Sequence, residues 1–234
     1  MSEWAMKRFW STASFEQVET GFEVRLDGRS VKTPAKRPLL LPTEAMAYQV
    51  ALEWDAQEDV VDPTAMPWTR SANASIDKVA IQRSEVFDHL ASYAETDLLC
   101  YRAEGPESLI DRQNAAWNPI LKWVAQKYGA RLAIASGVMP ISQASGDIER
   151  LAATMRGMTA FQLTGFYDLV TLTGSFVLAL AATESKESTE DLWAHSRIDE
   201  IWQSEQWGED EEATEQAETK KTAFFHAFSF YKAA

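Results

Sequence analysis

The stretch STEDLWAHSRIDEIWQSEQWG, residues 188–208, has the pattern of an amphipathic helix. Four apolar residues fall at i, i+4, i+7 and i+8, which is one face of an α-helix: Ala194, Ile198, Ile201 and Trp202. Ser188, three residues before Asp191, resembles a capping box at the positive end of the helix dipole. We therefore expect one helix over 188–208, buried along its apolar face.

An acidic run follows this helix. The sequence EDEEATEQAE, residues 209–218, holds six carboxylates, and no basic residue follows before Lys220. Such a run is by default a solvated helix face. It could also meet a basic patch on a partner, where complementary charge speeds encounter and rejects wrong partners.

The composition is that of a folded protein with an uneven charge. Of the 234 residues, 46% are hydrophobic and 24% charged, and the net charge is −13. This charge argues against a nucleic-acid or anionic-membrane binder, because phosphate contacts need Lys and Arg. Residues 1–42 carry a net +2 and residues 184–234 a net −8, which indicates two regions with different roles. The single Cys100 and the absence of a targeting pattern in MSEWAMKRFW favour a cytoplasmic protein.

The first 60 residues are predicted to combine strands with one helix. Phe22, Val24 and Leu26 alternate with charged residues, Asp27-Gly28 is a hairpin turn, and short strands are expected over 30–33 and 39–41. Thr43 is expected to cap a helix over 43–58. Four residues of this helix share an apolar face: Ala47, Val50, Ala51 and Trp54.

The remainder is predicted to be helical. Residues 59–71, with two prolines and no period, suit a linker. Beyond it we expect helices over 72–97, from Pro106 to Gly129, over 143–157 and over 210–232, with a short extended segment at 131–140 and Phe224, Phe228 and Tyr231 packed inward. The apolar run 159–183 is predicted to be a central core helix broken near Gly174; its polar residues and Asp168 argue against a membrane span. The predicted fold is α+β, with a small N-terminal antiparallel β/α domain (1–62) before a larger all-helical domain (63–234).

Few residues suggest catalysis. The three histidines lie far apart, and no metal, nucleotide-loop or nucleophile-elbow motif occurs, so we expect no metal, no cofactor and no catalytic residue. The alternative is a hydrolase. Asp97, Asp168 and Asp199 lie in apolar contexts, where desolvation raises a carboxyl pKa and suits it to acid–base work. Capping a helix or forming an ion pair would account for the same three residues.

Several separated strings together resemble a known family. They are LDGRSVKTP (26–34), LLLPTEAMA and ALEWDAQ (39–47 and 51–57), MPWTRSANASIDKV (66–79), TDLLCYR (96–102), WNPILKW (117–123) and the block from SRIDE to QWG (196–208). Their order and spacing resemble the ATP synthase assembly chaperones that bind the free α subunit of the catalytic head, over about residues 7–215. The most specific strings are E-W-D-x-Q, T-D-x-x-C-Y-R and Q-x-x-W-G.

The resemblance implies a non-enzymatic chaperone with an N-terminal α+β domain and a helical domain. It would hold the α subunit until that subunit pairs with β. We expect the chain to be monomeric when free, to bind no nucleic acid and not to be membrane-embedded. The residues it implies for partner binding are Trp54, Asp55, Asp199, Glu200, Trp207 and Glu211. Trp54 could instead anchor a helix on a sheet, and Trp207-Gly208 could simply end a helix.

Two features depart from the family. The chain lacks the mitochondrial transit segment of many members, which implies a bacterial-type cytoplasmic version. It also reads Ala213-Thr214-Glu215 where relatives often have A-H-D, so a role for that histidine does not carry over. Besides the chaperone and the hydrolase, a generic acidic adaptor with another partner remains a third hypothesis.

Overall fold

The computed structural model describes residues 7–137, 139–185 and 187–234, which form two compact units. The first contains residues up to 83 with 159–165 and 229–234; the second contains 84–158 and 166–228. Helices α6 (Ala160–Thr173) and α10 (Glu211–Ala233) contribute residues to both. These units differ in extent from the expected domains, 1–62 and 63–234, which stay a prediction. Residues 1–6, part of the stretch searched for a targeting signal, lie outside the described ranges.

The first unit is built on an antiparallel sheet. Strands β1 (Ala13–Val18) and β2 (Gly21–Leu26) form a hairpin, and β2 also pairs with β3 (Arg29–Ser30) and β4 (Leu40–Leu41). Asp27 and Gly28 both have positive φ, 46° and 79°, as the expected two-residue hairpin turn requires. Val24 and Leu26 are buried, so the predicted alternation is confirmed.

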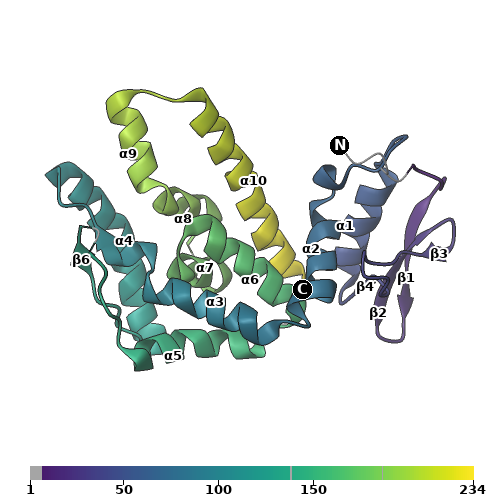
Figure 1. Cartoon of the computed structure of the whole chain (residues 1–234), viewed down its shortest axis with the longest axis horizontal. Helices are drawn as coiled ribbons and strands as arrows, with labels where there is room; N and C mark the ends of the chain where they lie inside the picture. The colour runs from purple at the N-terminus through teal and green to yellow at the C-terminus, as the bar shows by residue number, and fades with distance from the viewer. Residues whose placement is uncertain (1–6, 138, 186) are drawn as a thin grey trace. The chain divides into compact units, whose positions relative to one another are not determined.

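Helix α1 (Glu44–Asp55) covers one side of this sheet, and α2 (Pro67–Ala74) packs against α1 (Figure 1). The Thr43 hydroxyl accepts a hydrogen bond from the Met46 N–H, which confirms the predicted cap. The four residues of the predicted apolar face of α1 are buried: Ala47, Val50, Ala51 and Trp54. They join a core with Trp10, Leu39, Met66 and Phe230.

The predicted linker 59–71 is wrong in its second half, because α2 begins at Pro67 after a 3-10 turn, Pro63–Ala65. The Glu53 carboxylate accepts hydrogen bonds from the N–H groups of Trp68 (2.6 Å) and Thr69 (2.7 Å), in the first turn of α2. A carboxylate 15 residues earlier in the chain thus supplies the cap that the local sequence lacks.

The second unit is helical, with the predicted fold class confirmed. The π-helical turn Ser75–Val79, in the first unit, precedes it along the chain. The helices of the second unit are α3 (Arg83–Glu95), α4 (Glu107–Tyr128), α5 (Ser145–Ala153), α7 (Phe176–Glu184), α8 (Thr189–Ser196) and α9 (Ile198–Trp207), together with parts of α6 and α10. Two 3-10 turns lie between them, Leu98–Cys100 after α3 and Thr154–Gly157 after α5. Strands β5 (Tyr101–Arg102) and β6 (Ala135–Ser136) form a parallel pair. The helix expected over 72–97 is therefore interrupted, whereas the one expected over 143–157 is present as α5 and ends in the 3-10 turn.

The central core helix breaks at Gly174 as predicted, with φ 68° at that glycine. Ser175 then caps α7, its hydroxyl accepting from the Leu178 N–H (2.9 Å). Residues 176–183 of α7 are all buried. No helix within the described residues is long and apolar enough to cross a membrane.

The helix expected over 188–208 is instead two helices, α8 and α9, separated at Arg197 (Figure 1). The Trp117 indole donates to the His195 carbonyl (2.8 Å), which a continuous helix would offer to the N–H of residue 199. Because of the break, the buried residues differ from those of the predicted apolar face. Leu192, Trp193 and Ile198 are buried, whereas Ala194 and Ile201 are exposed. The predicted cap by Ser188 is confirmed: its hydroxyl accepts from the Asp191 N–H at 3.1 Å and donates to the Asp191 carboxylate at 2.7 Å.

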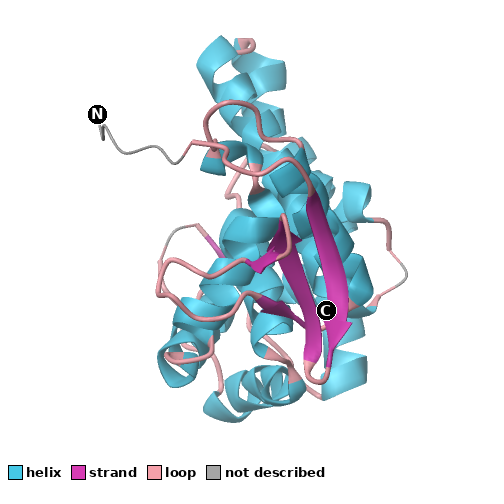
Figure 2. Cartoon of the chain, turned by 90° about the vertical axis from the view of Figure 1, so that its right-hand side faces the viewer, coloured by secondary structure: helices cyan, strands magenta, loops and turns pink. Residues whose placement is uncertain are grey.

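In α10 the buried residues are Phe224, Ala227 and Phe230. Phe224 packs inward as predicted, but Phe228 and Tyr231 are only half-buried. Figure 2, coloured by secondary structure, shows the strands of the first unit toward the viewer.

Candidate protein-binding surface

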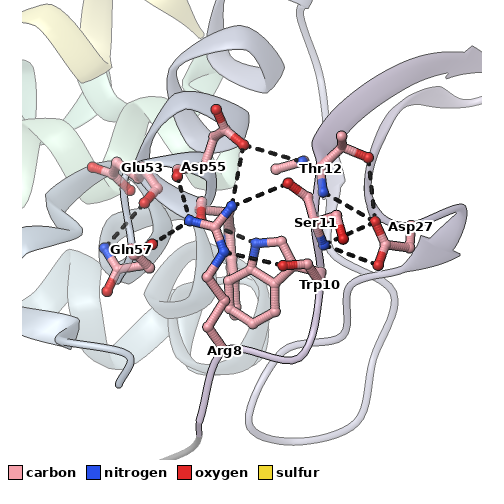
Figure 3. A network of polar contacts seen from close by, with 10 residues as sticks. Arg8, Trp10, Ser11, Thr12, Asp27, Glu53, Asp55 and Gln57 are labelled. Atoms are coloured by element: carbon pink, nitrogen blue, oxygen red, sulfur yellow. Dashed lines mark hydrogen bonds and ion pairs between the residues drawn. The ribbon is translucent and has the colours of Figure 1, made fainter. Parts of the chain in front are cut away.

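Arg8 fixes the end of α1, where two predicted site residues lie (Figure 3). Its guanidinium donates to the carbonyl of Asp55 (2.8 Å), the last residue of α1, and to that of Gln57, two residues further on. It also donates to the carbonyls of Trp10 (3.1 Å) and Ser11 (3.2 Å). One arginine thus ties the entering chain to the helix end.

Asp55 and Asp27 use their carboxylates to hold the same segment (Figure 3). The Asp55 carboxylate lies 3.7 Å from the Arg8 guanidinium and accepts from the Ala13 N–H at 3.4 Å, yet 57% of its side chain is exposed. Asp27 accepts from the N–H groups of Ser11 and Thr12, at 3.0 Å each, and these bonds lower its pKa.

Trp54 lies in the core of the first unit. It is 8% exposed and packs edge-on against Trp10 with ring centroids 5.2 Å apart; the Trp10 indole N–H donates to the Trp54 carbonyl (3.2 Å). The ring also lines a pocket of about 410 Å³ with Val61, Met66 and others. This position suits the role of an anchor between helix and sheet, and leaves little of the ring for a partner.

The other four predicted residues lie on α9 and at the start of α10, in the second unit. Asp199 accepts a hydrogen bond from the Gln113 side chain (2.6 Å), whose amide oxygen in turn accepts from the Ala103 N–H (2.9 Å). Glu200 pairs with Arg197 at 2.8 Å, one helical turn away. Trp207 is 80% exposed and Glu211 is exposed in the first turn of α10.

A groove of about 750 Å³ runs beside α9. Asp199 and Trp207 both line it, as do Trp202, Gln203 and Gln206; the other side comes from Leu109, Gln113 and the segment from Tyr101 to Pro106. Beneath it, buried Arg102 donates to the Gln113 carbonyl and the Asn118 side chain, both at 3.0 Å. The groove combines aromatic rings with two carboxylates, Glu104 and Asp199, and several amides, which suits a protein segment with apolar and basic residues.

The carboxylates of the hydrolase hypothesis have different surroundings. Asp97 is fully buried, caps the turn Leu98–Cys100, and accepts from the Ser175 hydroxyl (2.7 Å) and the Val177 N–H (2.9 Å). Desolvation raises its pKa to about 6 despite these hydrogen bonds. Asp168 is half-buried on α6, and Asp199 is bonded to an amide. Burial also raises the pKa of Cys100 to about 12, so the thiol is a poor nucleophile.

Within the described residues, no group of three or more His, Cys, Asp or Glu side chains could hold a metal ion. The groove beside α9 is lined by a mixed set of side chains, in which Asp199 and Glu104 supply the carboxylates.

Comparison with known proteins places the chain in a family. A sequence model of the family described as ATP12 chaperone protein matches residues 7–125, half of the chain. The chain belongs to this family. It is 24% identical over 223 residues to Protein atp12, mitochondrial, from Schizosaccharomyces pombe, covering 90% of the chain and 77% of that protein.

Solved structures of similar proteins have the same fold. Atp12 from Paracoccus denitrificans, also solved as a point mutant, is 43% identical, with a TM-score of 0.92 and 97% of both chains covered. The Atu1473 protein from Agrobacterium tumefaciens is 39% identical, with a TM-score of 0.92, covering 97% of this chain and 85% of that one. Membership of the ATP12 family makes the chain a chaperone and supports a role in ATP synthase assembly.

The site contains residues that sequence reasoning did not select. Gln113 positions Asp199, and Arg112 forms a two-pronged ion pair with Glu205 (2.9 and 3.0 Å) while lying 5.8 Å from the Trp202 ring centroid. These pairs join α4 to α9 across more than 80 residues of sequence, so no local pattern could identify them.

Proposed function

We propose that the chain binds the free α subunit of the ATP synthase catalytic head and covers it until it pairs with β. It would do so in the cytoplasm, as a monomer when free and by binding alone. The six residues proposed for contact are those implied by the resemblance: Trp54, Asp55, Asp199, Glu200, Trp207 and Glu211. Subunit interfaces of obligate complexes are large and apolar, so an unpaired subunit needs a cover.

The groove beside α9 is the observation that carries this proposal. Among the described residues, Trp207 is the most exposed large apolar side chain, at 80%, and such a ring on a protein surface is typical of a binding contact. Asp199 faces the same groove, and the acidic first turn of α10 follows directly in the chain. Carboxylates around a modest apolar centre give specificity while keeping the complex dissociable.

Charge reversal tests the proposal. We expect Asp199→Lys to weaken binding of the purified α subunit by at least about tenfold, because it replaces a complementary charge with a like one. Binding of the unmodified chain should also weaken as salt rises from about 0.05 M to about 0.5 M, since salt screens exposed charges. Isothermal titration calorimetry measures both.

Glu149→Lys is the matched control, because it makes the same charge change at an exposed position of α5 that does not line the groove. Unaltered circular dichroism of each variant would show that the fold is kept. Equal affinity of Asp199→Lys and Glu149→Lys for the α subunit would remove Asp199 from the interface. No binding of the unmodified chain at low salt would refute the proposed function.

A further inference from the structure

Strand β1 forms an edge of the sheet. The sheet is centred on β2, which pairs with β1 on one side and with β3 and β4 on the other. Figure 2 shows β1 as the long strand at the right-hand margin of the sheet. Within residues 7–137, 139–185 and 187–234, no strand pairs with its outer edge. An edge of this kind is a template for a further strand.

Two backbone hydrogen bonds establish which backbone groups of β1 point outward. The Asp27 N–H donates to the Thr12 carbonyl (3.1 Å), and the Val24 carbonyl accepts from Val31 on the far side of β2 (2.9 Å). Hydrogen-bonded and non-bonded pairs alternate along an antiparallel ladder, so Ser14 and Glu16 bond to β2. Phe15 and Gln17 therefore present their N–H and C=O groups to the outer edge, where the described parts of the chain supply no partner.

The carboxylate of Asp55 already occupies the first position along this edge. It accepts the N–H of Ala13, the next outward-pointing residue before Phe15, at 3.4 Å. It thus stands where the carbonyl of an adjacent strand would stand. The end of α1 closes one end of the edge and leaves Phe15 and Gln17 open.

Exposed apolar side chains of α1 flank the open positions. Tyr48 is 51% exposed and Leu52 is 46% exposed, one helical turn apart. The Phe15 and Tyr48 ring centroids lie 6.4 Å apart, which joins this stripe to the strand. A strand added beside β1 would cover both side chains with every second residue.

The opposite face of β1 carries charge. Glu16 points to that face, where it pairs with Arg25 and keeps 49% of its side chain exposed. Pairing two copies of β1 antiparallel, with Phe15 opposite Gln17, would place Glu16 directly against Glu16. Like charges directly opposite destabilise a sheet, and the net charge of −13 adds to the repulsion. The edge is therefore better suited to a partner strand with a basic residue at that position.

We propose that the outer edge of β1 binds an extended segment of the client protein by strand addition. The segment carries apolar side chains at alternate positions, toward Tyr48 and Leu52, and a Lys or Arg toward Glu16. The N–H and C=O groups of Phe15 and Gln17 form its main-chain hydrogen bonds. The inference rests on the proposed function, which supplies the client, the α subunit.

Amide hydrogen exchange tests the edge directly. In the complex with the purified α subunit, we expect exchange at Phe15 and Gln17 to slow by at least about tenfold, while Ser14 and Glu16, already bonded to β2, act as internal controls. Binding without protection of Phe15 and Gln17 would overturn the strand addition and leave the proposed function intact. Absence of binding would overturn both. Protection in the free chain that grows with its concentration would assign the edge to a second copy and overturn the inference.

Substitutions at one position separate backbone from side chain. Gln17→Pro removes an outward N–H without touching the ladder to β2, and should weaken binding of the α subunit by about tenfold, the equivalent of one hydrogen bond. Gln17→Thr keeps the N–H and should bind within about twofold. If Gln17→Pro unfolds the chain, binding of the α subunit is compared between Tyr48→Lys and Tyr48→Phe instead. We then expect weaker binding only for Tyr48→Lys. Equal affinity within either pair would refute the inference.

Discussion

Asp97 allows a quantitative test of how burial changes the pKa of a carboxyl group in the second unit. It is fully buried and accepts hydrogen bonds from the Leu99 and Val177 N–H groups and the Ser175 hydroxyl, so it ties the turn at 98–100 to the start of α7. These donors favour the ionised form, but desolvation outweighs them and raises its pKa from 3.8 to about 6.

The direction of the pH effect follows from this shift. Because its pKa is higher in the folded state, the folded chain binds the proton of Asp97 more tightly than the unfolded chain does. The resulting stabilisation is complete below the unfolded pKa and is lost as the pH rises through about 6. The rise of the pKa from 3.8 to about 6 corresponds to roughly 3 kcal/mol in the free energy of unfolding.

The perturbation is Asp97→Asn, which keeps the shape of the side chain but cannot ionise. Urea denaturation of both proteins at a pH of about 4 and of about 7.5 gives the stability of the unmodified chain relative to the variant. We expect this relative stability to fall by about 2.5 kcal/mol between the two pH values, slightly less than the full effect because a pH of about 4 lies just above the unfolded pKa. The exposed carboxyl of Asp59, changed to Asn, is the control for loss of one charge. The same relative stability at both pH values would refute the reasoning.

Two further predictions concern stability. Trp54→Ala should lower the free energy of unfolding by about 3–5 kcal/mol, since it removes a buried ring packed against Trp10; guanidinium denaturation measures this, and a loss below about 1 kcal/mol would contradict the anchor role. Ser188→Ala should cost about 1 kcal/mol, because the hydroxyl caps α8 by accepting the Asp191 N–H. Ser188→Asp, which can still cap, should keep the melting temperature, and equal losses in both variants would argue against capping.

The parts of the fold that could be predicted are set by neighbouring residues. Thr43 accepts from Met46, Ser188 accepts from Asp191, and Gly129 ends α4 in the left-handed conformation with φ 71°. Each depends on groups within one helical turn, so the residue type in its local context suffices. The hairpin at Asp27-Gly28 was predictable for the same reason.

The parts that failed depend on residues far apart in sequence. The indole of Trp117 takes the His195 carbonyl from 78 residues away and ends α8, although the local pattern favours a continuous helix. Glu53 caps α2 in a stretch whose prolines suggested a linker. In both places a tertiary hydrogen bond overrides the local preference, which a periodicity argument cannot include.

For the candidate surface, single residues could be predicted from the sequence, but their partners and the groove could not. The resemblance selected Asp199, but its partner Gln113 lies 86 positions earlier, and the groove exists only once α4 and α9 are packed together. The helical pattern predicted Ile201 to be buried; the break at Arg197 turns α9 and leaves it 41% exposed. The direction of a helix face therefore depended on where the helix began, which the sequence pattern did not reveal.

Some of the candidate residues have a clear role in stabilising the fold, and others do not. Trp54 fills a core, Glu200 pairs with Arg197, and Asp55 holds the Ala13 N–H and faces Arg8, so folding would favour each of them without a partner. Trp207 differs, because 80% of the residue is exposed and a ring in water adds little to stability. Exposed apolar surface carries a cost in unwanted association, which a binding function offsets. Trp207, with Asp199 in the same groove, is therefore the candidate whose position argues most directly for contact with a client.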